Sequence, residues 1–307
     1  MARDSTRQVY IVQWLRGVFA LTAFPGGLAV LLVCALPISA RAQARQAAAE
    51  PDPLVRARAL YNQQDYDGAI AAAIKARQRP GAADAADLVL ARAYLERFRK
   101  TSDRADLVIG RETLSLIQSG RLAPREQVEL VVGLAEALYL DGLYGASAEL
   151  FESALSRRDA GGQLAALTGR ARGQVLDWWA TALDREAQSR FSTDRGLPYM
   201  RILTVMQNEL ADNPGSAPAS YWLVMANRAI GDLDRAWDTA IAGWVRAGLA
   251  GDSEGPLRAE LDRVVLQAVI PERARLMAEG ERDRERIAAE LRAEWEAIKK
   301  DWKGLTL

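Results

Sequence analysis

The 307-residue chain contains no histidine and only one cysteine, Cys34. Ser-His-Asp and Cys-His catalysis both need an imidazole, so neither can operate here. Metal sites built from imidazole cannot form, and a thiolate site would depend on Cys34 alone. Any chemistry of the chain would therefore rest on carboxylates, Lys, Tyr, Ser or Thr, and no metal or other cofactor is expected.

The sequence also lacks the glycine loops that hold phosphates, since neither G-x-G-x-x-G nor G-x-x-x-x-G-K-[ST] occurs in it. It has no excess of positive charge, with 40 basic and 40 acidic residues and a formal net charge of zero. Nucleic-acid binding needs concentrated positive charge. A nucleic-acid partner is therefore not expected.

Aromatic residues make up only 7% of the chain although hydrophobic residues make up 50%, so much of the apolar content is alanine and leucine. These two residues lose little conformational freedom in a helix. There is no sustained period-2 alternation of β-branched and aromatic residues, which would predict a large sheet. The predicted fold class is all-α.

The first 44 residues have the form of a bacterial secretory signal. Arginines precede an uncharged run over residues 17–40, and Pro37 breaks this run ahead of small residues that suit cleavage after Ala42 or Ala44. The arginines are Arg3, Arg7 and Arg16. The alternative is an uncleaved inner-membrane anchor, because a run of this length could span a bilayer. We therefore expect an exported, periplasmic protein, or an anchored one that faces the periplasm, with residues 45–52 as a disordered leader.

Helical hairpins recur along residues 53–247. In the clearest unit, residues 131–154, Gly142 permits a tight turn between two helices, and small Ser147 lets them approach closely. Tyr144 and Phe151 are bulky residues that fill the space beside Ser147. The positions that define the unit are Leu134, Ala135, Leu138, Gly142, Tyr144, Ser147, Phe151 and Ala154.

The same spacing is repeated elsewhere in the chain. The first copy is Leu60, Gln64, Tyr66, Ala69, Ala73 and Ala76; a partial copy is Leu107, Gly110, Leu114 and Ile117; a late copy is Gly231, Leu233, Ala236 and Ala240. The partial copy follows a connecting segment, residues 99–106, that is longer than the other turns. A more divergent pair of helices, around Val175 and Ile202, precedes the late copy.

This alternation of small and bulky positions resembles the tetratricopeptide-repeat (TPR) family over about residues 53–247. The resemblance implies a right-handed α-solenoid of about five helical hairpins. In TPR proteins the first helix of each hairpin lines a groove that receives a peptide or helix of a partner. The corresponding residues here are Leu54, Arg58, Tyr61, Asn62, Glu136, Tyr139, Leu140, Tyr221 and Met225.

Two of these groove residues, Tyr61 and Tyr139, occupy the same repeat position, which suits a ladder of stacked or hydrogen-bonded side chains. The alternative is that both are ordinary surface tyrosines. Some TPR proteins hold a partner's terminal carboxylate with a Lys/Asn arrangement. That arrangement is missing here, where the corresponding residues are Arg58, Glu136 and Met225.

Adjacent tryptophans, Trp178 and Trp179, lie about 100° apart on a helix, so they are not expected to point into one seam. One of them is a candidate exposed aromatic at a groove or interface, where Trp is a frequent hot spot. The flanking acids Asp177 and Asp184 are the best pair for two-carboxylate glycosidase chemistry, which is the enzymatic alternative.

Beyond residue 255 the repeat pattern fades. Pro256 and Pro271 suit the first turns of two helices, over residues 257–269 and 272–302. The second has an amphipathic stripe of Ile287, Leu291, Trp295, Ile298 and Trp302. We favour a C-terminal cap that covers the last repeat, and the alternative is docking onto a partner or a second copy of the chain.

The sequence as a whole predicts a non-catalytic scaffold that binds a peptide or helix of another protein, in envelope assembly or secretion. Its partner is a protein, and no small-molecule cofactor is expected.

Overall fold

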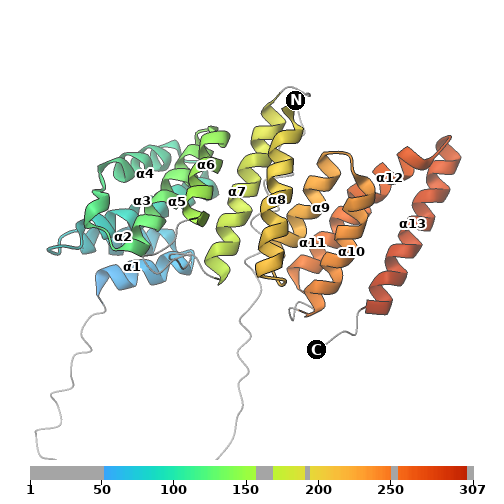
Figure 1. The fold of residues 1–307 in the computed structure, drawn as a ribbon. Coiled ribbons are helices and arrows are strands. Elements are labelled where there is room, and N and C mark those ends of the chain that lie inside the picture. Colours follow the sequence, from blue (N-terminus) through green and yellow to red (C-terminus); the bar gives the residue numbers. More distant parts are fainter. Residues whose placement is uncertain (1–51, 157–168, 191–193, 250–254, 303–307) are drawn as a thin grey trace, which may run out of the picture. The chain divides into compact units, whose positions relative to one another are not determined.

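The structure, a computed structural model, describes residues 52–156, 169–190, 194–249 and 255–302. Within these ranges every regular element is a helix and there is no strand (Figure 1). The predicted all-α class is therefore confirmed. The predicted secretory signal over residues 1–44 lies outside the described residues, as does nearly all of the leader.

Helices α1 to α10 form successive pairs joined by short connections, and each pair also packs on the next. The first pairs are α1 (Pro53–Asn62) with α2 (Tyr66–Ala76), α3 (Ala83–Thr101) with α4 (Arg104–Leu116), and α5 (Pro124–Leu140) with α6 (Tyr144–Ser156). They are followed by α7 (Gly169–Ser189) with α8 (Gly196–Asp212), and α9 (Ala217–Ala229) with α10 (Leu233–Leu249). A short 3₁₀ helix, η2 (Ser119–Arg121), connects α4 to α5. This serial packing of helix pairs is consistent with an α-solenoid.

One turn geometry recurs within three of these pairs. Gln64, Gly142 and Gly231 all have left-handed φ angles, of 63°, 79° and 84°. In each case this residue donates its N–H to the carbonyl three residues earlier, and the next residue donates to the carbonyl five residues earlier. This is the Schellman pattern that satisfies the last carbonyls of a helix. The positions that the sequence equates therefore make the same turn, and the second helix starts two residues later in all three pairs.

The small residues at equivalent positions lie where paired helices approach each other. Ala69, Ser147 and Ala236 are all completely buried, and the Ser147 hydroxyl donates to the carbonyl of Ala135 over 2.8 Å. At the equivalent position of α4, a Cβ added to Gly110 would lie 2.8 Å from a methyl carbon of Leu95. A side chain of even moderate size would separate these helices.

The connection between α3 and α4 is shorter than the sequence predicted. Helix α3 continues to Thr101, so only Ser102 and Asp103 separate it from α4. Ser102 has a left-handed φ of 60° and donates its N–H to the carbonyl of Phe98 over 2.7 Å. Asp103 caps α4 by accepting from the N–H of Ala105 over 3.0 Å. Neither Ser102 nor Asp103 is a glycine, so the sequence carries no glycine to mark this short turn.

The C-terminal helices also differ from the prediction. Helix α11 (Pro256–Val264) continues through a short π-helix, η4 (Val265–Val269), directly into α12 (Ile270–Met277). Proline has no N–H and its ring clashes with the preceding turn. The wider π-helix lies immediately before Pro271 and accommodates it without ending the helical run. The predicted single helix over residues 272–302 is wrong, because the chain becomes extended at Ala278 before α13 (Glu281–Trp302).

The apolar stripe of α13 packs within the chain. Ile287, Leu291 and Trp295 are buried in a cluster that includes residues of α10 and α11, and the Trp295 indole N–H donates to Asp262 over 2.8 Å. Ile298 is half-buried, whereas Trp302 remains 43% exposed. The stripe down to Trp295 is therefore occupied by intrachain packing, as a terminal cover requires.

None of the helices in the described ranges is long and apolar enough to cross a bilayer. The predicted alternative of a membrane anchor concerns the N-terminal residues outside those ranges.

Candidate functional site: the odd-helix face

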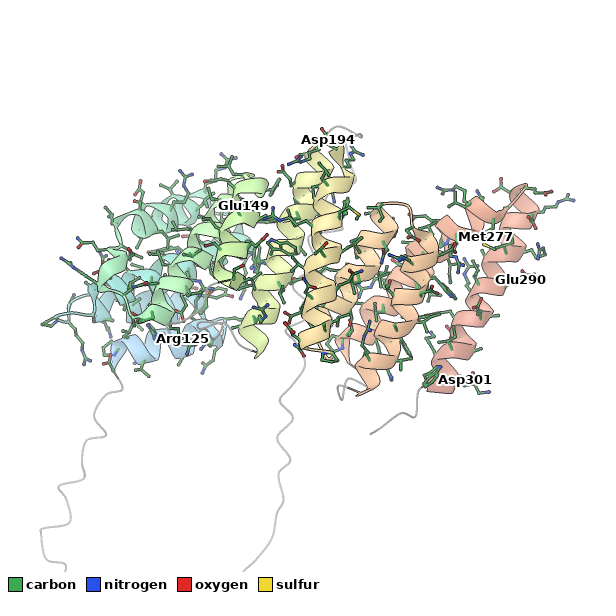
Figure 2. All side chains as sticks on the ribbon, viewed as in Figure 1. Arg125, Glu149, Asp194, Met277, Glu290 and Asp301 are labelled. Carbon is green, nitrogen blue, oxygen red and sulfur yellow. The ribbon has the colours of Figure 1, made fainter. Side chains whose placement is uncertain are left out.

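The odd-numbered helices contact one another in two runs, and Tyr139 of α5 contacts Trp178 of α7 between them. Helix α1 packs on α3, α3 on α5, α7 on α9 and α9 on α11, while the even-numbered helices α2, α4, α6 and α8 pack mainly on the odd-numbered helices beside them. The side chains of all these helices are drawn in Figure 2. We call the surface shared by α3, α5, α7, α9 and α11 the odd-helix face. The residues that define it are Glu96, Arg99, Tyr139, Asp177, Trp178, Arg185, Tyr221, Met225 and Glu260.

Trp178 of α7 is the centre of this face. The Arg99 guanidinium of α3 lies 4.3 Å from the centre of its ring, and Tyr139 of α5 meets it edge-on at 5.0 Å. Phe151 of α6 stacks beside it at 6.0 Å. Arg185 lies beside Tyr139, and burial raises the pKa of that tyrosine while this cation opposes the shift. Four helices therefore bring aromatic and guanidinium groups together around a half-buried indole, a group that we call the Trp178 cluster.

The acidic part of the face lies beside this cluster. Asp177 accepts a hydrogen bond from the Trp222 indole of α9 over 2.8 Å. Burial raises the pKa of Asp177, the hydrogen bond opposes this, and Arg99 and Glu260 act on the same carboxylate through space. Burial also raises the pKa of Tyr221, with further contributions from Glu260 and Asp177. The charges of α3, α7 and α11 are thus close enough to influence one another.

Comparisons of the chain with protein-family models, with curated proteins and with solved structures find no match.

The first predicted groove residues form a packed cluster across α1, α3 and α5. The Arg92 guanidinium lies 5.0 Å from the ring centre of Tyr61 and pairs with Glu136 over 3.2 Å, and Arg58 pairs with Glu126. Glu136 is only 3% exposed, and burial raises the pKa of its carboxyl while Arg92 opposes the shift. Glu136 therefore ties α5 to α3 and does not lie on an open groove surface, contrary to the prediction.

The two tyrosines at equivalent repeat positions make equivalent contacts. Tyr61 packs on Tyr66 with ring centres 5.8 Å apart, and Tyr139 packs on Tyr144 at 5.2 Å. Each contact lies within one hairpin, between the first helix and the start of the second. The two tyrosines thus stabilise their own turns, and Tyr139 in addition contacts Trp178.

Some of the remaining predicted groove residues pack against apolar clusters, and others lie at the surface. Leu54 and Leu140 are half-buried against apolar clusters, and Asn62 is exposed at the end of α1. Met225 is half-buried and packs beside Tyr221 on α9, next to the acidic part of the face. Tyr139, Tyr221 and Met225 are the predicted residues that lie on the odd-helix face.

The adjacent tryptophans occupy different environments. Trp179 is completely buried and donates its indole N–H to Glu152 over 3.1 Å, so of the two candidates only Trp178 is accessible. Trp178 and Trp179 lie about 100° apart around α7. The Trp179 indole therefore lies in the seam between helices, and the Trp178 indole lies on the odd-helix face.

The proposed carboxylate pair makes two separate sets of contacts. Asp177 bonds to Trp222 of α9, whereas Asp184 accepts from Tyr199 of α8 over 2.8 Å and from Gln188 over 2.6 Å. Each acid thus joins α7 to a different neighbouring helix. Within the described ranges, no group of three or more acidic side chains is placed to hold a metal ion.

Sequence reasoning missed Arg99, Arg185 and Glu260 as members of the face. Arg99 had been assigned to a connecting segment, although it lies inside α3. The helical spacing of Arg92, Glu96 and Arg99 was the available signal, because residues three or four apart share one face of a helix.

Proposed function

We propose that this chain is a non-catalytic scaffold of the TPR type and that its odd-helix face binds a peptide or helix of a protein partner. The observation that carries the proposal is the Trp178 cluster, where Arg99 and Tyr139 contact a half-buried indole and Arg185 lies beside Tyr139. Trp, Tyr and Arg are the residue types most enriched at binding hot spots. A partner that covers this cluster would bury aromatic surface beside charges of both signs.

The TPR assignment is supported by two features, and the right-handed arrangement is proposed with it from the resemblance alone. The same left-handed turn occurs at Gln64, Gly142 and Gly231, and small residues recur at the helix contacts. Repeat patterns identify a fold better than a partner, so the residues of the face define the binding chemistry.

We also propose export to the periplasm, from the form of residues 1–44, and a role there in envelope assembly or secretion. Mass spectrometry of the protein recovered from the producing cells should give an N-terminus at Gln43 or Arg45. An N-terminus at or near Met1 would support the retained membrane anchor in place of a cleaved signal.

The proposal is tested by reversing one charge on the face and one charge away from it. Arg99→Glu removes the cation from Trp178, whereas Arg104→Glu changes an exposed arginine on α4. Proteins captured from envelope extract by the wild type would be identified and purified, and their affinities measured by calorimetry.

We expect Arg99→Glu to weaken binding of the partner at least about tenfold, which is the loss of one hot-spot contact. Arg104→Glu should bind like the wild type, and circular dichroism should give equal helix content for all three proteins. Equal affinities for the two folded variants would refute binding at this face.

A further inference from the structure

A second site lies apart from the odd-helix face, in a cleft of about 340 Å³ between α12 and α13. Its floor is apolar and made of Pro271, Ala274 and Ala288. Ala274 and Ala288 are buried, and because both are small, the space between the two helices is not filled by side chains. The larger apolar residues of α13 are engaged elsewhere, in the cluster with α10 and α11. The cleft therefore exists because small alanines face it while the larger apolar side chains of α13 pack against other helices.

The rim of the cleft is strongly basic. Three arginines line it, Arg275 from α12 with Arg284 and Arg292 from α13, against one acid, Glu285. Arg284 forms an ion pair with Glu281. By contrast, Arg275 and Arg292 make no ion pair within the described part of the chain.

Three other arginines of α12 and α13, Arg273, Arg284 and Arg286, form ion pairs. Arg273, two residues from Arg275, pairs with Asp234 over 2.7 Å. Arg286, on another side of α13, pairs with both Asp283 and Glu290. Acidic side chains are therefore plentiful on these helices, yet within the described ranges Arg275 and Arg292 at the cleft, like the exposed Arg282 of α13, form no ion pair with them.

Guanidinium groups bind carboxylates and phosphates through paired N–H donors. An apolar floor beside such donors adds affinity only for a ligand that also has apolar surface to bury. We infer that the cleft between α12 and α13 binds an organic oxyanion, a carboxylate on a small apolar body, with Arg275 and Arg292 as its main ligands. The apolar body rests on Ala274 and Ala288.

The test uses the whole protein and N-acetyl-leucine as the probe, with N-acetyl-leucinamide and inorganic phosphate as comparison ligands. Binding is followed in ¹⁵N NMR spectra, through the arginine Nε–H resonances of the wild type and through the backbone amides of α12 and α13 in every protein. The test variant is Arg275→Gln/Arg292→Gln. The control variant is Arg282→Gln/Lys300→Gln, which removes two charges from exposed positions of α13. A third variant, Ala288→Leu, fills the floor and keeps every charge.

We expect N-acetyl-leucine to shift the Arg275 and Arg292 resonances saturably, and to bind more tightly than either comparison ligand. Its affinity should fall at least tenfold in Arg275→Gln/Arg292→Gln and in Ala288→Leu, and should be unchanged in the control variant. Binding of the amide or of phosphate as tight as that of N-acetyl-leucine would overturn the inference. So would unchanged affinity in either test variant that retains its helix content.

Discussion

At the residue scale, backbone conformation explains why three helices end where they do. Glycine adopts a left-handed φ at little cost, whereas other residues pay about 1–2 kcal/mol. Gly142 and Gly231 meet this requirement, but Gln64 adopts the same conformation with a side chain. The first of the three turns therefore contains local strain that the other two lack.

Replacing Gln64 with glycine should raise the free energy of unfolding by about 0.5–1 kcal/mol, since relief of the left-handed strain exceeds the entropy that glycine adds to the unfolded chain. Urea unfolding followed by circular dichroism measures the change. The matched control is Gln63→Gly, at a residue with a φ of −83°, which should lower stability or leave it unaltered. A loss of stability in Gln64→Gly would contradict the turn geometry.

Burial raises the pKa of the Asp177 carboxyl in the folded protein. The free energy of unfolding therefore depends on the ionisation of Asp177. A carboxyl with a raised folded-state pKa favours folding while it is protonated, and this contribution is lost as pH rises from the unfolded-state pKa, about 3.9, through the folded-state pKa. An asparagine at this position would not titrate. The substitution Asp177→Asn should therefore improve stability relative to wild type more at pH 7 than at pH 4.

Urea unfolding of both proteins at the two pH values provides the comparison. An equal difference at pH 4 and pH 7, or a larger one at pH 4, would mean that Asp177 is not destabilised by ionisation in the folded state.

At the scale of elements, the distance between paired helices depends on a few small side chains. The closest case is α3 against α4, where a Cβ on Gly110 would lie 2.8 Å from a Leu95 methyl and 3.1 Å from the Ala91 carbonyl oxygen. A backbone oxygen cannot move aside as a flexible side chain can.

Gly110→Ala should therefore lower the free energy of unfolding by about 1–3 kcal/mol, the usual cost of overpacking, even though alanine favours helices. In Gly196→Ala the new methyl group meets no atom within 4 Å, so that variant should be as stable as the wild type or more stable. Equal stabilities for the two variants would show that α3 and α4 are less tightly packed than described.

The terminal element, α13, depends on Trp295. Its indole is completely buried, contacts Trp237 and Trp244, and donates to Asp262. Trp295→Ala should cost about 3–5 kcal/mol of local stability and speed hydrogen exchange throughout α13 and α12. Trp302→Ala, at an exposed residue, should change stability by less than about 0.5 kcal/mol. Unaltered exchange in Trp295→Ala would argue against the cap.

At the scale of the whole molecule, the sequence predicted those features that depend on local patterns. Gly142 and Ser147 could be assigned because a turn and a close approach impose residue types on neighbouring positions. The π-helix before Pro271 could not be predicted, because proline in a helical context more often marks a helix start. The contact of Arg99 with Trp178 joins helices far apart in the chain, and no local pattern encodes it.

In the candidate site, too, local patterns could be predicted from the sequence and contacts between distant helices could not. Tyr139, Tyr221 and Met225 were placed on the face by repeat register alone, whereas Glu136 was misplaced because register does not reveal that Arg92 draws it into the packed interior. Burial of a charged residue depends on its partner, and that partner lies on a different hairpin.

The central claim, that a partner binds on the odd-helix face, is tested most directly by site-specific photo-crosslinking in the producing cells. The photoreactive residue benzoylphenylalanine would replace Thr181 or Met225 on the odd-numbered helices, and Ile74 or Val108 at exposed positions of the even-numbered helices. We predict that positions 181 and 225 crosslink to one common protein and that positions 74 and 108 do not. Crosslinks to that protein from positions 74 and 108, with none from 181 or 225, would contradict binding at the odd-helix face.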